Sequence, residues 1–335
     1  LGLLPPADPG DDELAHGHIA GDDLWAAAGL RSAIAAAALA GRTDLAGTWS
    51  AIDARFEASL RRALAAAVAR AGHIPPVLDS AGGEDWGNYD AAYPVEVLPP
   101  DSSAVRATVA WARAHMAEGL ATYEHGHSLH DYLAFSIFQT ELLGGDVSDA
   151  LAGLYSELAH TTSTDGGWEW GIAPYGTRAS EVNLSPHGTF AGDYVALLRD
   201  MLVADTPGGG VSLLAGASPA WLAPGEHITV TAAPTARGVI SFSERSSARG
   251  ETLTWQSDLV RGTALTWTLP WWARDAHLAS GAPVGSRVAL PSASGSIAVT
   301  FAGRRPSQSY AATVAALNAS YRARSRPEPL VAGAG

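Results

Sequence analysis

The sequence predicts a multidomain α and β protein in which helical hairpins precede an antiparallel β-sandwich. Residues 44–71 carry apolar side chains at spacings of three and four, which describe one buried stripe on a helix. After a Gly-rich joint at 205–210, apolar residues alternate with Ser and Thr, as in strands with one buried face. We therefore place a helical domain at 1–205, a sandwich at 211–304 and a tail with a weak helix at 305–335.

Composition limits the classes of partner. The chain has 335 residues, 47% of them hydrophobic, which is ample for a large core, and it has no cysteine for disulfide or thiolate chemistry. It carries 34 acidic and 21 basic residues, a formal net charge of -13, and every basic residue is Arg. Nucleic acids and anionic membranes attract basic faces, so neither is expected as a partner. No uncharged apolar run is long enough to span a bilayer. Localisation and oligomeric state stay open.

The helical part is expected to consist of hairpins. Asp22 and Asp23 lie where first-turn acids belong, and the helix that they begin should run to about residue 40 and pair with the helix at 44–71. The connection 73–101 is long and irregular, and such loops in compact domains are usually functional. Further helices are expected at 102–117, 129–143, 147–160, 186–203 and, weakly, 308–322.

The C-terminal part is expected to be the sandwich. The alternating pattern predicts strands that include 228–231, 239–242, 252–255, 263–267 and 297–301. We expect no strand before residue 200. The pair Trp271-Trp272 is expected at an apolar interface between the sandwich and the helices.

The most informative stretch is Thr161–Trp170. It places Glu169 between two indoles, those of Trp168 and Trp170, after a Gly-Gly pair that lets the backbone turn freely. Aromatic rings beside an acid can stack on the apolar face of a sugar, and they desolvate the carboxyl, which adjusts its pKa for proton transfer. The alternative is a partly buried structural glutamate.

Glycoside hydrolysis needs two carboxyls, one to protonate the leaving oxygen and one to activate water or attack the sugar. The candidates for the partner of Glu169 are Asp22, Asp23, Glu84 and Asp85, all at turns between helices. The simpler alternatives are helix capping for the first two and a solvated turn for the other two.

Aromatic and polar residues in the same loops are candidates for sugar contacts. They are Trp86, Tyr89, His125, His127, His130, Trp168, Trp170, Tyr175, Asn183 and His187. Tryptophans within helices, such as Trp25 and Trp111, are expected mainly in the core. The cluster from Glu124 to Asp131 lacks the helical His-x-x-x-His register of many zinc sites, so no metal and no cofactor are expected.

Several of these runs resemble the six-hairpin glycosidase superfamily, whose α/α-toroid enzymes include bacterial α-L-rhamnosidases, trehalases and processing α-glucosidases. The runs are 22–31, 85–89, 118–123, 160–170 and 183–188. The resemblance implies a partial α/α toroid before the β-sandwich. A complete toroid has twelve helices, and about six are expected here, so the first hairpins are expected to be missing from an N-terminally incomplete member.

The resemblance also implies roles for individual residues. In rhamnosidase-like members a Thr pair and a Trp-Glu-Arg-Trp run carry the catalytic base, and Thr161, Thr162 and Glu169 stand in a similar order here, without the Arg. In trehalase-like members the general acid begins a helix, as Asp22 and Asp23 do.

The expected function is hydrolysis of a neutral oligo- or polysaccharide by carboxylate acid/base catalysis. One alternative is a polysaccharide lyase, which would abstract a proton with Asn183, His187 and either Tyr194 or Tyr175. A lyase must neutralise a uronate carboxylate, and the central loops offer only Arg178 for this, so the hydrolase is favoured. The other alternative is a carbohydrate-binding remnant without catalysis.

Overall fold

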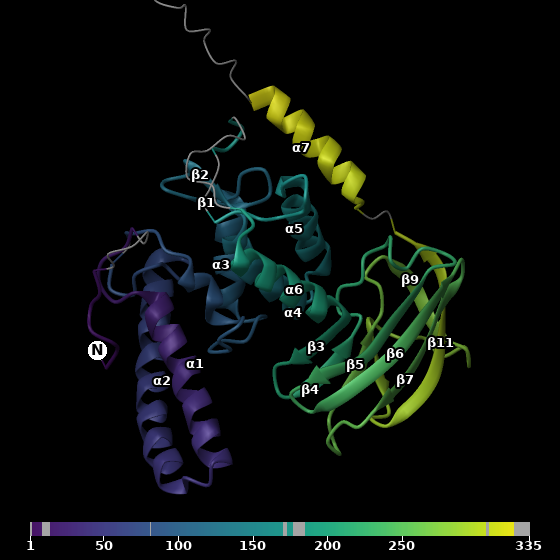
Figure 1. Ribbon diagram of the computed structural model, residues 1–335, viewed down its shortest axis with the longest axis horizontal. Coiled ribbons are helices and arrows are strands. Elements are labelled where there is room, and N and C mark those ends of the chain that lie inside the picture. Colours follow the sequence, from purple (N-terminus) through teal and green to yellow (C-terminus); the bar gives the residue numbers. More distant parts are fainter. Residues whose placement is uncertain are drawn as a thin grey trace, which may run out of the picture.

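The structure is a computed structural model that describes residues 2–8, 14–80, 82–169, 173–176, 185–305 and 308–324. An N-terminal helical region precedes two β-sheets (Figure 1). The described helices do not close into a ring, so the toroid implied by the resemblance is not shown. None of these helices is both long and apolar enough to cross a lipid bilayer.

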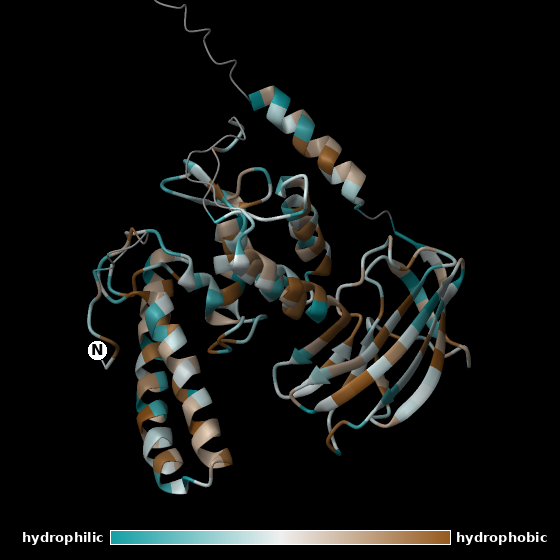
Figure 2. Cartoon of the chain, in the orientation of Figure 1, coloured by the Kyte–Doolittle hydropathy of each residue, from teal (hydrophilic) through white to brown (hydrophobic). Residues whose placement is uncertain are grey.

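The first two helices, α1 (Ala20–Leu39) and α2 (Thr43–Ala71), form the expected hairpin, which projects from the rest of the molecule (Figure 1). Its inner end belongs to a core in which Leu60 and Leu64 pack with Leu24. Its outer end also carries hydrophobic residues (Figure 2), and Leu39 is 90% exposed there. The inner end, which anchors the hairpin, therefore positions the start of α1.

Four helices surround a second core: α3 (Ser103–His115), α4 (Phe135–Gly144), α5 (Val147–His160) and α6 (Gly188–Leu202). Between α4 and α5, Gly145 has a φ of 93°, a conformation that favours glycine. The two helices pack closely because Gly153 of α5 leaves room for the Phe138 ring of α4.

The expectation that no strand precedes residue 200 is wrong. A short hairpin, β1 (Ala121–Tyr123) and β2 (Ser128–His130), replaces the start of the helix expected at 129–143. Glu124 and His125 have φ values of 52° and 57° and Gly126 follows at 81°, so the turn uses left-handed conformations at two residues other than glycine. A 3₁₀ turn, η2 (Tyr132–Ala134), then leads into α4.

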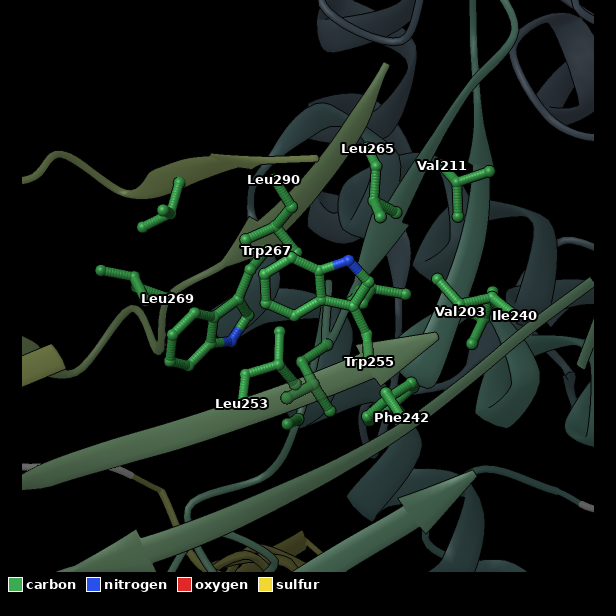
Figure 3. Close-up of a cluster of buried hydrophobic side chains, with 14 of the residues drawn as sticks. Val203, Val211, Ile240, Phe242, Leu253, Trp255, Leu265, Trp267, Leu269 and Leu290 are labelled. Carbon is green, nitrogen blue, oxygen red and sulfur yellow. The ribbon is translucent and has the colours of Figure 1, made fainter. Parts of the chain in front are cut away.

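The C-terminal strands form two sheets that share one hydrophobic core. The strands are β3 (Val203–Thr206), β4 (Gly210–Leu213), β5 (His227–Thr235), β6 (Gly238–Ser247), β7 (Gly250–Ser257), β8 (Leu265–Thr268), β9 (Ala273–Leu278), β10 (Arg287–Leu290) and β11 (Ser294–Arg304). One sheet has the order β10-β8-β4-β3 and the other β5-β6-β7-β11-β9, with every pair antiparallel except β4 with β8. Figure 3 shows Trp267 of the first sheet and Trp255 and Phe242 of the second directed into this core.

Two tryptophans join the sheets to the helices. Trp221 and Trp271 pack against both the core of the sheets and the core around α4. Trp272, by contrast, is buried in the core of the sheets, where its ring lies 4.3 Å from the guanidinium carbon of Arg304.

The helix α7 (Tyr310–Arg324) runs from the end of the second sheet back to the helical region (Figure 1). The Tyr310 ring contacts Tyr155 of α5, and the Tyr321 hydroxyl donates a hydrogen bond to the Gly176 carbonyl at 2.7 Å. No residue of α7 is buried, so these surface contacts hold it.

Two buried carboxyls lie on the buried face of the second sheet, Glu244 on β6 and Glu251 on β7. The Ser246 hydroxyl donates to Glu244 Oε1 at 2.8 Å. Burial raises the pKa of Glu244 to about 7, and burial together with the nearby Glu244 raises the pKa of Glu251 to about 8.

Candidate functional site

The first candidate feature is a cavity of about 340 Å³ with two aspartates in its wall, which we term the aspartate cavity. Asp90 comes from a 3₁₀ turn, η1 (Gly87–Ala91), and Asp193 from α6. Five aromatic side chains share the wall: Trp25, Trp86, Tyr93, Tyr132 and Phe135. Carboxyls among aromatic rings can bind sugar hydroxyls while the rings cover the apolar face of the sugar.

Both aspartates hold protons more tightly than usual. Burial, aided by the negative charges of Asp85 and Asp193, raises the pKa of Asp90 to about 6, although hydrogen bonds from Ser136 and Trp25 oppose the shift. The Trp25 indole N–H donates to Asp90 Oδ2 at 2.8 Å. Burial alone raises the pKa of Asp193 to about 6. Each carboxyl can therefore act as a proton donor just below neutral pH.

Close packing of two glycines holds η1 in place. A Cβ atom on Gly87 would lie 2.5 Å from the Cα of Gly21 in the first turn of α1, and one on Gly21 would lie 2.9 Å from the Gly87 Cα. Side chains at either position would force the segments apart. This contact brings Asp90 beside Trp25, which lies one turn further along α1.

A second cavity, of about 470 Å³, shares Trp86 and Leu133 with the first, and we term it the aromatic cavity. Five residues predicted as site residues line it: Glu84, Asp85, Trp86, Tyr89 and His125. Trp111, which was expected mainly in the core, lines it as well.

Glu84 is engaged by the turn of the β1–β2 hairpin. Both of its carboxylate oxygens accept hydrogen bonds from the His125 amide, at 2.8 and 3.0 Å, and Oε1 lies 3.1 Å from His125 Nδ1. The backbone of Glu84 also pairs with Leu14, whose amide donates to the Tyr123 hydroxyl at 3.0 Å. The segment before α1, the loop at 82–90 and the hairpin thus meet at one place.

Trp168, directly before Glu169, is held at two points. Its amide donates to Asp131 Oδ2 at 2.6 Å, and its indole N–H donates to the His160 carbonyl at 3.0 Å. The Trp168 indole therefore anchors the loop, and the residue Glu169 beside it is half-buried.

The loop of Glu169 reaches the aspartate cavity indirectly, through the contact of His187 with Tyr132. The His187 amide donates to the Gly167 carbonyl at 3.2 Å, and the His187 ring meets the edge of Tyr132 at 4.9 Å. Neither Glu169 nor His187 lines the aspartate cavity, but Tyr132 does, so these contacts connect the loop of Glu169 to one residue of its wall.

Contacts of the buried Glu118 hold the loop that contains Tyr175, further along the chain from Glu169. Glu118 Oε2 lies 3.0 Å from His160 Nε2, and Glu118 Oε1 accepts the Tyr175 amide at 2.6 Å. Tyr175 thus holds its loop to the buried Glu118, and the guanidinium carbon of Arg324 lies 4.9 Å from its ring.

The other predicted site residues that the structure describes do not line either cavity. Asp23 is 1% exposed and accepts the Leu4 amide at 2.9 Å, whereas Asp22 and His127 are exposed. His130 is buried, which lowers its pKa to about 4, and its ring contacts Tyr123 and Tyr132. Trp170, Asn183 and the alternative lyase cation Arg178 lie outside the described residues.

Sequence reasoning missed Asp90 and Asp193, and it placed Trp25 in the core although this side chain is 52% exposed. Asp90 directly follows the run 85–89, so its neighbours could have suggested it. Asp193 lies on a helix face with no such signal, because the cavity forms only when Tyr93 and Pro94 pack near α6.

No protein-family model matches the chain, and no curated protein matches it. Among solved structures it is distantly similar to a glycosidase variant with a glutamate replaced by alanine, at 17% identity and a TM-score of 0.46 over 59% of this chain and 56% of that chain. A second glycosidase variant of this kind, in complex with glucose, matches at 15% identity and a TM-score of 0.37, over 55% and 47%. The chain thus spans about half the length of each. Scores this low do not establish a shared fold.

Proposed function

We propose that this chain is a glycoside hydrolase that acts on a neutral oligo- or polysaccharide in the aspartate cavity. The observation that carries the proposal is Asp90, a buried carboxyl with a pKa of about 6 in a wall with five aromatic side chains. A volume of about 340 Å³ lies at the lower end of the range for small-ligand sites, which suits a single sugar ring.

In the proposed reaction, Asp90 is the general acid that protonates the oxygen of the leaving group. Its burial supports this role, because the carboxyl keeps its proton close to neutral pH, where an exposed aspartate has lost it. Asp193, in the same wall, would bind the hydroxyls of the sugar. The acid is thus assigned to Asp90 in preference to Glu84, whose carboxylate the His125 amide already engages.

The proposed general base is Glu169, which would activate the attacking water or, as a nucleophile, attack the sugar. Glu169 is half-buried and follows the anchored Trp168, and its loop is connected through His187 to Tyr132 in the wall of the cavity. The anchoring supports the role because a base must be held within hydrogen-bond reach of the water that it deprotonates.

We also infer that the helical region, up to the end of α6 at Leu202, is part of an α/α toroid of the six-hairpin type, and that the two sheets form a β-sandwich that begins with β3 at Val203, before the expected residue 211. The helix pairs α1–α2 and α4–α5, each joined by a short connection and packed together, support the first inference. The single core shared by the two sheets supports the second.

The test is hydrolysis of a panel of neutral glycosides by the 335-residue chain and its variants. We expect Asp90→Asn and Glu169→Gln to lower kcat by about 10²- to 10⁴-fold with little change in KM, because they remove proton transfer and keep the shape of the side chain. The Asp90→Asn loss should be smaller for nitrophenyl leaving groups, which need little protonation. The matched control is Glu226→Gln, an exposed residue in the segment before β5.

Near-normal turnover by Glu169→Gln would remove Glu169 from the mechanism. The lyase alternative centred on His187 is tested separately with a uronate-containing polysaccharide. That alternative gives an unsaturated sugar product, which absorbs in the ultraviolet and would be detected directly.

A further inference from the structure

The wall of the aromatic cavity is formed mainly by aromatic rings and aliphatic side chains, which a ligand could contact. Its wall contains Trp86, Tyr89, Trp111, Tyr123, Leu133 and Ile137. At about 470 Å³ it falls within the range of small-molecule sites, and it adjoins the aspartate cavity at Trp86 and Leu133.

The polar groups in this wall mainly bind one another. Glu84 accepts the His125 amide, His115 Nδ1 lies 2.7 Å from the Trp111 carbonyl, and the Thr122 hydroxyl donates to the His115 carbonyl at 2.9 Å. The Tyr123 hydroxyl donates to the Glu84 carbonyl at 3.3 Å. A charged ligand or a second sugar would find few free partners here and would lose its hydration.

The rings of the wall are held in place by stacking. Trp111 is stacked between His73, at a centroid distance of 4.5 Å, and His115, at 4.1 Å. Tyr123 meets Trp86 edge-on at 5.7 Å. A ligand ring would therefore enter a preformed site and would not have to order these side chains.

We propose that the aromatic cavity binds a neutral aromatic ring, the aglycone of an aryl glycoside whose sugar occupies the aspartate cavity. This inference rests on the proposed function, since it assigns the other half of the same substrate. The shared residues Trp86 and Leu133 support it, because a glycosidic bond would pass beside them.

The test measures binding of 2-naphthol alone, by calorimetry and by tryptophan fluorescence, so that it does not depend on hydrolysis. Ala112 lines the cavity from α3, and Ala112→Phe would fill it. We expect saturable binding to the wild type and about a tenfold loss in Ala112→Phe, the scale of one well-packed ring contact. The matched control is Ala110→Phe, an exposed position on the same helix, which should bind within about twofold of the wild type.

A second variant, Trp111→Leu, tests the same site without overpacking and should weaken naphthol binding by a similar factor. Both variants should also raise KM for a naphthyl glycoside more than for the methyl glycoside of the same sugar.

Unchanged naphthol affinity in both variants, or no saturable binding to the wild type, would overturn the inference. Naphthol binding that depends on Ala112 and Trp111, with no glycoside hydrolysed, would support the ring site and contradict the proposed function.

Discussion

The amide of Trp168 donates a hydrogen bond of 2.6 Å to Oδ2 of Asp131, the residue directly after β2. The other oxygen of Asp131 accepts the Tyr132 amide at 2.8 Å. One buried carboxyl therefore fixes both the residue before Glu169 and a wall residue of the aspartate cavity. Its contacts give Asp131 a positioning role.

Replacing Asp131 by Ala should lower kcat at least about tenfold with a smaller change in KM, because two part-buried N–H groups lose their acceptor and Glu169 moves with its loop. The free energy of unfolding should fall by about 2–4 kcal/mol. Denaturant unfolding and steady-state kinetics would measure both. Asp131→Asn, which keeps one acceptor, should recover part of the loss. Asp146→Ala is the control, since Asp146 is exposed and its side chain makes no capping bond. A stable Asp131→Ala enzyme with full kcat would exclude the positioning role.

The pH profile of kcat/KM should have an alkaline limb near pH 6. The general acid must be protonated, and burial raises the pKa of Asp90 to about 6, so activity is present below that value and is lost as pH rises through it. Asp90→Asn should remove the limb along with most of the activity. If Asp193→Asn removed the limb while Asp90→Asn kept it, the acid role would pass to Asp193, whose pKa is also about 6.

Stability of the second sheet should decline from weakly acidic to weakly alkaline pH. The folded-state pKa values of Glu244 and Glu251, about 7 and about 8, lie above the ordinary glutamate value of 4.5. Between these limits the folded state holds protons that the unfolded state has released. The free energy of unfolding should therefore fall by up to about 1.4 kcal/mol per pH unit for each carboxyl and level off above about pH 8. The positive charge of Arg304 near Glu251 limits the effect.

Thermal unfolding from pH 5 to pH 9 would measure this slope. Glu251→Gln imitates the protonated carboxyl and should flatten the slope, whereas Glu226→Gln, which is exposed, should not. An equally steep decline in Glu251→Gln would contradict the assignment.

Two glycine-to-alanine substitutions should have opposite signs. Alanine usually stabilises a helix by up to about 1 kcal/mol over glycine. A Cβ atom on Gly29 in α1 would meet nothing within 4 Å, so Gly29→Ala should raise the melting temperature. A Cβ on Gly153 would lie 2.2 Å from the buried Phe138 ring, so Gly153→Ala should lower it. Stabilisation by Gly153→Ala would show that Phe138 can move aside.

Helices and strands could be predicted where apolar residues recur with the period of one face of a helix or strand. The helix α5 occupies the expected residues 147–160, and α2 begins one residue before the expected 44. The β1–β2 hairpin was missed because Glu124 and His125 adopt left-handed conformations that their residue types do not predict. The short strands β3 and β10 could not be predicted either, because they form only by pairing with the other strands of their sheet.

The residues of the candidate site also fall into those that the sequence could predict and those that it could not. The run around Glu84 and Trp86 could be found because acids and aromatic residues are concentrated in a long loop. Asp193 could not, because its cavity depends on contacts from α1, η1 and α4 that the local pattern of α6 does not contain. Trp25 followed a helical pattern typical of core residues, and only the structure assigns its indole N–H to Asp90.

The contact of α7 with the Gly176 loop has a consequence for the order of synthesis. Tyr321 leaves the ribosome 145 residues after Gly176, to which its hydroxyl is bonded. At typical elongation rates this is a delay of roughly 7 to 30 s. Throughout that interval the nascent chain carries Tyr175 and Gly176 without the helix α7, so these residues must wait for the contacts of Arg324 and Tyr321 that the finished protein makes.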